Sequence, residues 1–307
     1  MPRLTPRQTR LAAIVYVVIS FLLLGAGWLA WRNYGAGRGD VGGAVRLAAF
    51  GFAAQSLAGI VAIHHVPAPS EGVRLVDAIG IGLFFAAASG VLYLALEPFI
   101  RRRWPQSLIS WTRLLAGDVR DPLVAGHVLL ATAFGVAMAI VRDGVSWYQW
   151  QALARLPLND NHFDVLDPGL MVSWVLTGLI QPAAIVMGLL FLFMFFRLLL
   201  RNTWAAAAVI AALGVVLGVT ASGPVAGVAA AVQLSLLLWL MLRFGILPGA
   251  LFLLISGLMH TPLTSDVSAW YASRGLTIVA LTLALAVWSF RKALGGRQVL
   301  KVGLLDA

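Results

Sequence analysis

Residues 169–196 read GLMVSWVLTGLIQPAAIVMGLLFLFMFF, a long apolar run that contains no charged residue. A helix needs about 20 apolar residues to cross the hydrocarbon of a bilayer, so this run is long enough to span one. Hydrocarbon offers no partner for backbone N–H and C=O groups, which leaves helices and closed barrels as spanning structures. A barrel would show segments of about ten residues with alternating polarity. The run therefore predicts a transmembrane helix.

The rest of the chain has the same apolar character. Of its 307 residues, 61% are hydrophobic and only 11% are charged, and the mean hydropathy is +0.91. A water-soluble domain of this size does not need so apolar a composition. We therefore expect an all-α fold, a polytopic transmembrane helix bundle, with residues 1–307 forming a single integral membrane domain.

Apolar runs between charged or Gly-Pro segments predict about nine spans. The predicted spans are residues 11–31, 47–63, 76–96, 123–141, 169–196, 205–219, 225–242, 244–258 and 275–290. The sixth and eighth are short, and the boundary between the sixth and seventh depends on a Gly-Pro turn signal. Two connections stand out, an arginine-rich elbow at 97–122 and an extracytoplasmic loop at 142–168.

The distribution of basic residues predicts which end of the bundle meets the cytosol. Lys and Arg favour the cytoplasmic side of short loops. If the N-terminus lies outside, 15 of the 22 Lys and Arg residues fall on the cytoplasmic side. Arg3, Arg7 and Arg10 argue for the reverse, because basic residues before an apolar run also begin signal sequences. We expect an outside N-terminus and an inside C-terminus.

The elbow is the most distinctive segment, EPFIRRRWPQSLISWTRLLAGDVRDP. Its apolar residues share one helical face, which predicts a short amphipathic helix near 106–116 lying on the inner leaflet. Anchoring at lipid phosphates explains the segment, and so does docking of a cytoplasmic partner or of a specific anionic lipid. The candidate docking residues are Arg101, Arg102, Arg103, Trp104, Trp111, Arg113 and Arg120.

Histidines gather on the predicted outer side. His64, His65 and His260 fall at the outer ends of spans, on the side that also carries Asp266. Imidazole and carboxylate groups together suit a metal ion, and a pair of histidines suits haem. The spacing matches no compact ligand motif, and interfacial histidines without a ligand explain it as well. These four residues form a candidate outer-face ligand or metal site.

Gln181 and Pro182 interrupt the run 169–196. Polar residues at membrane depth often mark pathways, and a proline breaks a helix locally, as in the discontinuous helices of transporters. Proline is also a common structural feature of membrane helices. The pair is a candidate solute pathway.

Several classes of function lack the residues they need. The chain has no cysteine, which excludes disulfides, thiolate metal sites and cysteine nucleophiles. No P-loop or nucleophile elbow is present, and the GAGRG at 35–39 precedes no strand-to-helix unit. No catalytic residue and no cofactor is predicted. We assign the net charge of +10 to topology and to anionic lipid headgroups rather than to nucleic acid.

Several stretches carry a resemblance to a known group of proteins. Among them are RNYGAGRGD from Arg32, LYLALEPFIRRRWPQSLISWTRLLAGDVRDPLV from Leu92, PLTSDVSAWYASRGL from Pro262 and FRKALGGR from Phe290. With these the chain resembles the C-terminal multi-span membrane region of acidobacterial-type bacterial serine/threonine protein kinases. The resemblance implies a cytoplasmic kinase domain and a first membrane crossing ahead of this region, which agrees with an outside N-terminus.

The chain departs from that group in two respects. The His-Arg-Asp and Asp-Phe-Gly motifs of a kinase domain do not occur in it, so kinase activity is not carried over. Where the group continues its central stretch with Gly-Arg-Asp, this chain has Ala125, Gly126 and His127.

The leading hypothesis is a sensory or signalling module, multi-pass in a bacterial inner membrane, without catalysis of its own. A cytoplasmic kinase or other signalling protein would be its partner, beside the lipid bilayer. One alternative is a small-solute transporter or permease that uses Gln181 and Pro182. A second alternative is a metal- or haem-binding membrane redox protein that uses the outer histidines.

Overall fold

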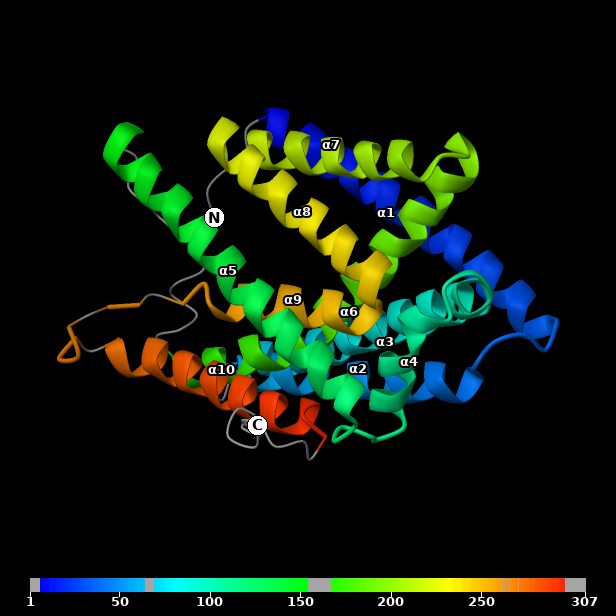
Figure 1. Ribbon diagram of the computed structural model, residues 1–307, viewed down its shortest axis with the longest axis horizontal. Coiled ribbons are helices and arrows are strands. Elements are labelled where there is room, and N and C mark those ends of the chain that lie inside the picture. The colour runs from blue at the N-terminus through cyan, green and yellow to red at the C-terminus, as the bar shows by residue number, and fades with distance from the viewer. Residues whose placement is uncertain are drawn as a thin grey trace, which may run out of the picture.

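The computed structural model describes residues 6–63, 69–153, 167–261, 263–264, 266–269 and 271–295. Over these residues the chain is all-helical and has no strand, as predicted (Figure 1). The helices are α1 (Pro6–Gly35), α2 (Val41–Val61), α3 (Pro69–Arg103), α4 (Gln106–Leu115), α5 (Pro122–Leu153), α6 (Pro168–Leu200), α7 (Thr203–Ser222), α8 (Pro224–Phe244), α9 (Ile246–Leu258) and α10 (Ala272–Ala293).

Helix starts coincide with residues that satisfy free backbone N–H groups. The Asp167 carboxylate accepts from the N–H groups of Gly169 and Leu170 at the start of α6, at 2.6 and 3.1 Å. The Asn202 amide oxygen does the same at the start of α7. The first N–H groups of a helix have no partner within the helix, so such side chains fix where it begins.

Eight of the described helices are long and apolar enough to cross a membrane, all except α4 and α9. They correspond to eight of the nine predicted spans, and the chain is a multi-pass membrane protein. The predicted span at 244–258 is the exception. It forms α9, whose 13 residues rise about 20 Å, against about 30 Å of hydrocarbon. By its length α9 is not among the helices that could cross the membrane, so eight of the nine predicted spans have such a helix in the described part of the chain.

Helix α9 is apolar because protein surrounds it. Ile246, Leu247, Phe252 and Ile255 are at most 2% exposed, and α5, α6 and α8 pack against the helix. A helix that is hydrophobic all round is either lipid-facing or buried, and sequence composition is the same in both cases. The short helix therefore forms part of the core rather than the lipid-facing wall.

The predicted cytoplasmic connections meet at one end of the bundle. Asp40, just before α2, lies beside Glu97 near the end of α3, and His127 in the second turn of α5 lies beside Ser110 of α4. A Cβ atom at Gly295, just after α10, would contact Pro122 at the start of α5. This arginine-rich end is defined by the loops around residues 36–40, 104–121, 201–202, 245 and 294–295. In Figure 1 the ends of α1 and α3 lie toward the right of the view.

Toward the other end of the bundle, α5 is longer than predicted. It extends to Leu153, so the first part of the predicted loop at 142–168 is helical, and residues 154–166 lie outside the described residues. Arg142 is half-buried there, and its Nη1 donates to the Ser256 carbonyl at 2.9 Å. Carbonyls in the last turn of a helix lack helical partners, so Arg142 ties α5 to the end of α9.

A tight turn at Gly245 joins α8 to α9. Its φ is 107°, a backbone conformation that a side chain disfavours by about 1–2 kcal/mol. A Cβ atom here would also collide with the backbone of Ser107 in α4. Only glycine allows α4 to approach this turn.

We expect Gly245→Ala to lower the free energy of unfolding by about 2 kcal/mol or more, from the strained φ and the collision together. The measurement is the thermal unfolding midpoint of the purified chain in detergent. Gly257→Ala is the matched control, because a Cβ atom at Gly257 meets nothing within 4 Å. Equal midpoints for the two variants would contradict this account of the turn.

Candidate functional site

The three consecutive arginines of the elbow form the last turn of α3 and are exposed, as a docking role requires. Arg101 forms an ion pair with Glu97 one turn earlier, and Arg103 stacks over the Phe99 ring at 5.2 Å. Arg102 lines a cavity described below. Basic residues also suit the negative end of a helix dipole, so this position is favourable for all three.

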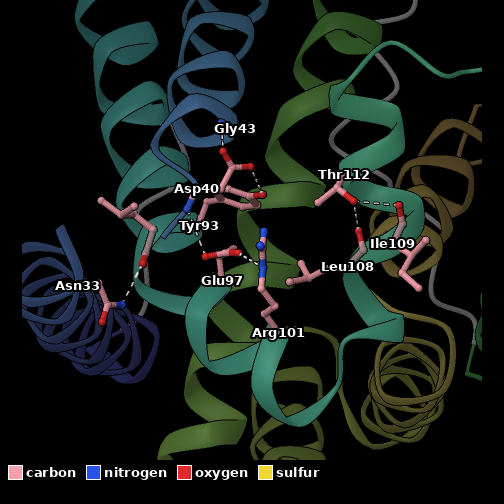
Figure 2. A network of polar contacts seen from close by, with 10 residues as sticks. Asn33, Asp40, Gly43, Tyr93, Glu97, Arg101, Leu108, Ile109 and Thr112 are labelled. Carbon is pink, nitrogen blue, oxygen red and sulfur yellow. Dashed lines mark hydrogen bonds and ion pairs between the residues drawn. The ribbon is translucent and has the colours of Figure 1, made fainter. Parts of the chain in front are cut away.

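Pro98 opens a gap in the hydrogen bonding of α3 just before this basic turn. Proline has no N–H, so the carbonyl of Leu94, four residues earlier, loses its helical donor. The Asn33 side chain of α1 fills the gap, because its Nδ2 donates to the Leu94 carbonyl at 3.0 Å and to the Ala95 carbonyl at 3.2 Å. The contact fixes α1 against α3 (Figure 2).

A polar cluster joins α2 and α3 beside this contact (Figure 2). The Asp40 N–H donates to Glu97 Oε2 at 3.2 Å, and the Tyr93 hydroxyl donates to Asp40 Oδ2 at 3.2 Å. Asp40 Oδ1 accepts from the Gly43 N–H at 2.7 Å and caps α2. Glu97 is only 2% exposed, and buried carboxylates are stable only when paired. Arg101 supplies that pairing from the surface.

The cluster borders a polar cavity of about 480 Å³. Residues 37–40 form one wall, and Glu97, Pro98, Arg101 and Arg102 form the other. The two carboxylates in the walls and Arg101 are engaged by the cluster, so the guanidinium groups of Arg38 and Arg102 are the charges left to meet an incoming molecule. The cavity is suited to anions at the membrane surface.

The amphipathic helix of the elbow forms as predicted, as α4, but its apolar face packs on protein rather than on lipid. Leu108 and Trp111 are each 4% exposed and belong to the main hydrophobic core. The helix contacts α2, α3, α5, α8 and α9. Trp111 is therefore not on the docking surface where the sequence analysis placed it. The exposed face of α4 carries Arg113.

The far side of the elbow is closed by an ion pair. Arg113 Nη1 donates to Asp121 Oδ2 at 2.7 Å. This hydrogen bond from Arg113 holds the pKa of Asp121 below its ordinary value. Arg120 is exposed beside it. The pair fixes the return of the chain from α4 to α5.

Trp104 connects the elbow to α6. It is half-buried, with the guanidinium of Arg197 at 4.8 Å from its ring centroid and the Phe193 ring at 6.4 Å. A cation over an aromatic face is worth about 0.5–2 kcal/mol, more when desolvated. The tryptophan therefore holds α3 and α6 together rather than projecting outward.

Only half of the predicted outer-face site falls within the described part of the chain, so the site stays a prediction. His64 and His65 lie outside the described residues. Asp266 is exposed and accepts from the backbone and hydroxyl of Ser268, and these hydrogen bonds lower its pKa. His260 is half-buried just after α9. No group of three or more metal-binding side chains occurs among the described residues.

The predicted pathway residues lie within α6, which continues through them. Pro182 is buried, whereas Gln181 is half-buried. Pro182 lines a second cavity, of about 380 Å³, which is mainly apolar. The cavity lies between α2, α4, α6 and α9, and Arg46 is the charged residue in its wall.

The sequence did not predict that Asn33, Asp40 and Tyr93 lie close together. One signal was present, because Asp40 directly precedes an apolar run and such a residue caps helices. Pro98 within an apolar helix was a second signal that a donor must come from elsewhere. Neither signal names the partner, which lies 53 to 62 residues away along the chain.

Comparison with known protein families, with curated proteins and with solved structures finds no match.

Asn33 and Pro98 should be coupled in a double-mutant cycle. We expect Asn33→Ala to lower the free energy of unfolding by about 1–3 kcal/mol, because the Leu94 carbonyl loses its donor. With Pro98→Ala already present, an N–H at position 98 can donate to that carbonyl, so the cost of Asn33→Ala should fall below about 1 kcal/mol. The measurement is the unfolding midpoint of the four proteins. Strictly additive effects would contradict this role of Asn33.

Proposed function

We propose that this chain is a sensory or signalling module of a bacterial inner membrane, with its arginine-rich end in the cytosol. The basic turn of α3 would dock a soluble partner, and the helix bundle would carry the change that the partner reads. The proposal assigns the chain no catalytic step.

The polar cluster is the observation that supports the proposal most directly. Glu97 is contacted at once by the backbone of Asp40, at the start of α2, and by the exposed side chain of Arg101. A shift of α2 against α3 would alter the pairing of the buried carboxylate. Since an unpaired buried charge costs several kcal/mol, Arg101 would have to follow the shift. The cluster therefore links a helix displacement to an exposed charge.

Such a module needs two arrangements of the bundle with different affinities for the cue. A ligand shifts an equilibrium only by that difference in affinity. Helices α2 and α3 pack closely at Gly59, where a Cβ atom would collide with Ala78. Such a glycine contact lets one helix slide along the other. The α2–α3 pair is thus the element we propose to be displaced.

The identity of the partner rests on the resemblance to the membrane regions of bacterial serine/threonine kinases. A kinase domain on the cytoplasmic side would meet the exposed Arg102 and Arg103 in the last turn of α3. Complementary charges at the rim of an interface mainly steer association and fix its orientation.

A transporter remains the second candidate, because Pro182 lies beside the 380 Å³ cavity. That cavity is mainly apolar, so it suits an apolar solute better than an ion or a sugar. Solute uptake by proteoliposomes that contain the purified chain separates the two proposals, since a sensor needs no net flux.

We expect the double variant Arg102→Gln/Arg103→Gln to weaken association with a kinase-domain polypeptide about five- to tenfold, as two rim charges are lost. Arg101 is kept, because it neutralises Glu97. The measurement is crosslinking in native membranes followed by quantitative mass spectrometry.

The matched control is Arg291→Gln/Lys292→Gln, which removes two exposed charges from the last turn of α10. It should leave the association unchanged. If no kinase-domain polypeptide is captured by any of the three proteins, or if both double variants behave like the wild type, the proposal fails.

A further inference from the structure

The mainly apolar cavity of about 380 Å³ has the size and lining of a small-molecule site. Its buried walls come from α6 and α9, including Ile180, Ala183 and Ala250. Phe50 and Leu179 also line it and are 49% and 42% exposed. Exposed apolar residues on a spanning helix face hydrocarbon, so the cavity opens toward the acyl chains of the bilayer.

The cavity wall holds an unsatisfied polar group. Trp111 is 4% exposed, and its indole Nε1 has no hydrogen-bond acceptor among the described residues. A buried indole N–H ordinarily finds an acceptor, and leaving one unpaired costs about 1–3 kcal/mol. The Nε1 atom is itself fully buried, so Trp111 lines the cavity with its ring and not with its N–H.

Arg46 adds a positive charge to the same cavity. It lies in the second turn of α2, at the arginine-rich end, and its side chain is exposed. Its Nε donates to the Gly42 carbonyl at 3.3 Å, which leaves the terminal guanidinium nitrogens available for an anion. Guanidinium groups bind phosphate oxygens in a fixed geometry.

We propose that this cavity binds one anionic phospholipid of the surrounding bilayer. Such a lipid offers a headgroup with a net negative charge to Arg46 and an acyl chain to the apolar walls. The bilayer is the source because the cavity opens to it through Phe50 and Leu179. The inference goes beyond the proposed signalling role, because it concerns the purified chain without any partner.

The test is a lipid titration of the purified full chain in a neutral detergent, followed by native mass spectrometry. Phosphatidylglycerol, phosphatidylcholine and palmitate are titrated separately. We expect one site that prefers phosphatidylglycerol to phosphatidylcholine. Arg46→Gln should weaken phosphatidylglycerol binding about fivefold and remove the preference. Trp111→Phe should weaken both lipids alike, because it changes the apolar wall that holds the acyl chain common to them.

Matched controls come from residues at the same end of the bundle that do not line the cavity. Arg291→Gln and Trp204→Phe should each leave the titrations unchanged, since neither residue lines the cavity. The Arg46→Gln variant alters an exposed side chain, so it tests the proposal even if Trp111→Phe does not fold.

Two results would overturn the proposal. Equal affinity for the two phospholipids, unchanged by Arg46→Gln, would show that the cavity does not recognise the anionic headgroup. Palmitate bound at one site that neither phospholipid competes for would identify a free fatty acid as the occupant instead.

Discussion

The structure depends on one constraint, the satisfaction of backbone hydrogen bonds where no water is present. Where a helix loses a bond within itself, another helix supplies it. Asn33 of α1 donates to the carbonyl that Pro98 leaves free in α3, and Arg142 of α5 donates to a carbonyl in the last turn of α9. These hydrogen bonds join helices that are far apart in sequence. A carbonyl that has no donor within its own helix is thus satisfied by a contact between two helices.

The same constraint explains why the charged residues are arranged in layers at the arginine-rich end. A carboxylate at the depth of Glu97 is stable only with partners, which the Asp40 N–H and the Arg101 side chain provide. The buried Glu97 thereby fixes the position of the exposed Arg101 side chain. Arg102 and Arg103, at the end of α3, do not pair with Glu97. The proposed docking role is therefore assigned to these two arginines.

Much of the architecture could be predicted from the sequence, because a spanning helix needs a long apolar run and little else. Eight spans and the helix α4 were found in this way. The burial of helix α9 and of Trp111 was not predicted, for a shared physical reason. Apolar residues occur equally where lipid covers a helix and where protein covers it. Composition therefore did not show that α9 and Trp111 are buried within the bundle. The cluster around Asp40 was missed because its members meet only through tertiary packing.

The central claim is that the chain crosses a membrane with the arginine-rich end in the cytosol. The sequence contains no cysteine, so a single introduced cysteine reports one position alone. Asp118→Cys marks the exposed elbow and Val267→Cys marks the exposed segment between α9 and α10. A membrane-impermeant maleimide applied to intact spheroplasts should label Val267→Cys at once and Asp118→Cys only after lysis. Labelling of Asp118→Cys in intact spheroplasts, or recovery of either variant in the soluble fraction, would contradict the account.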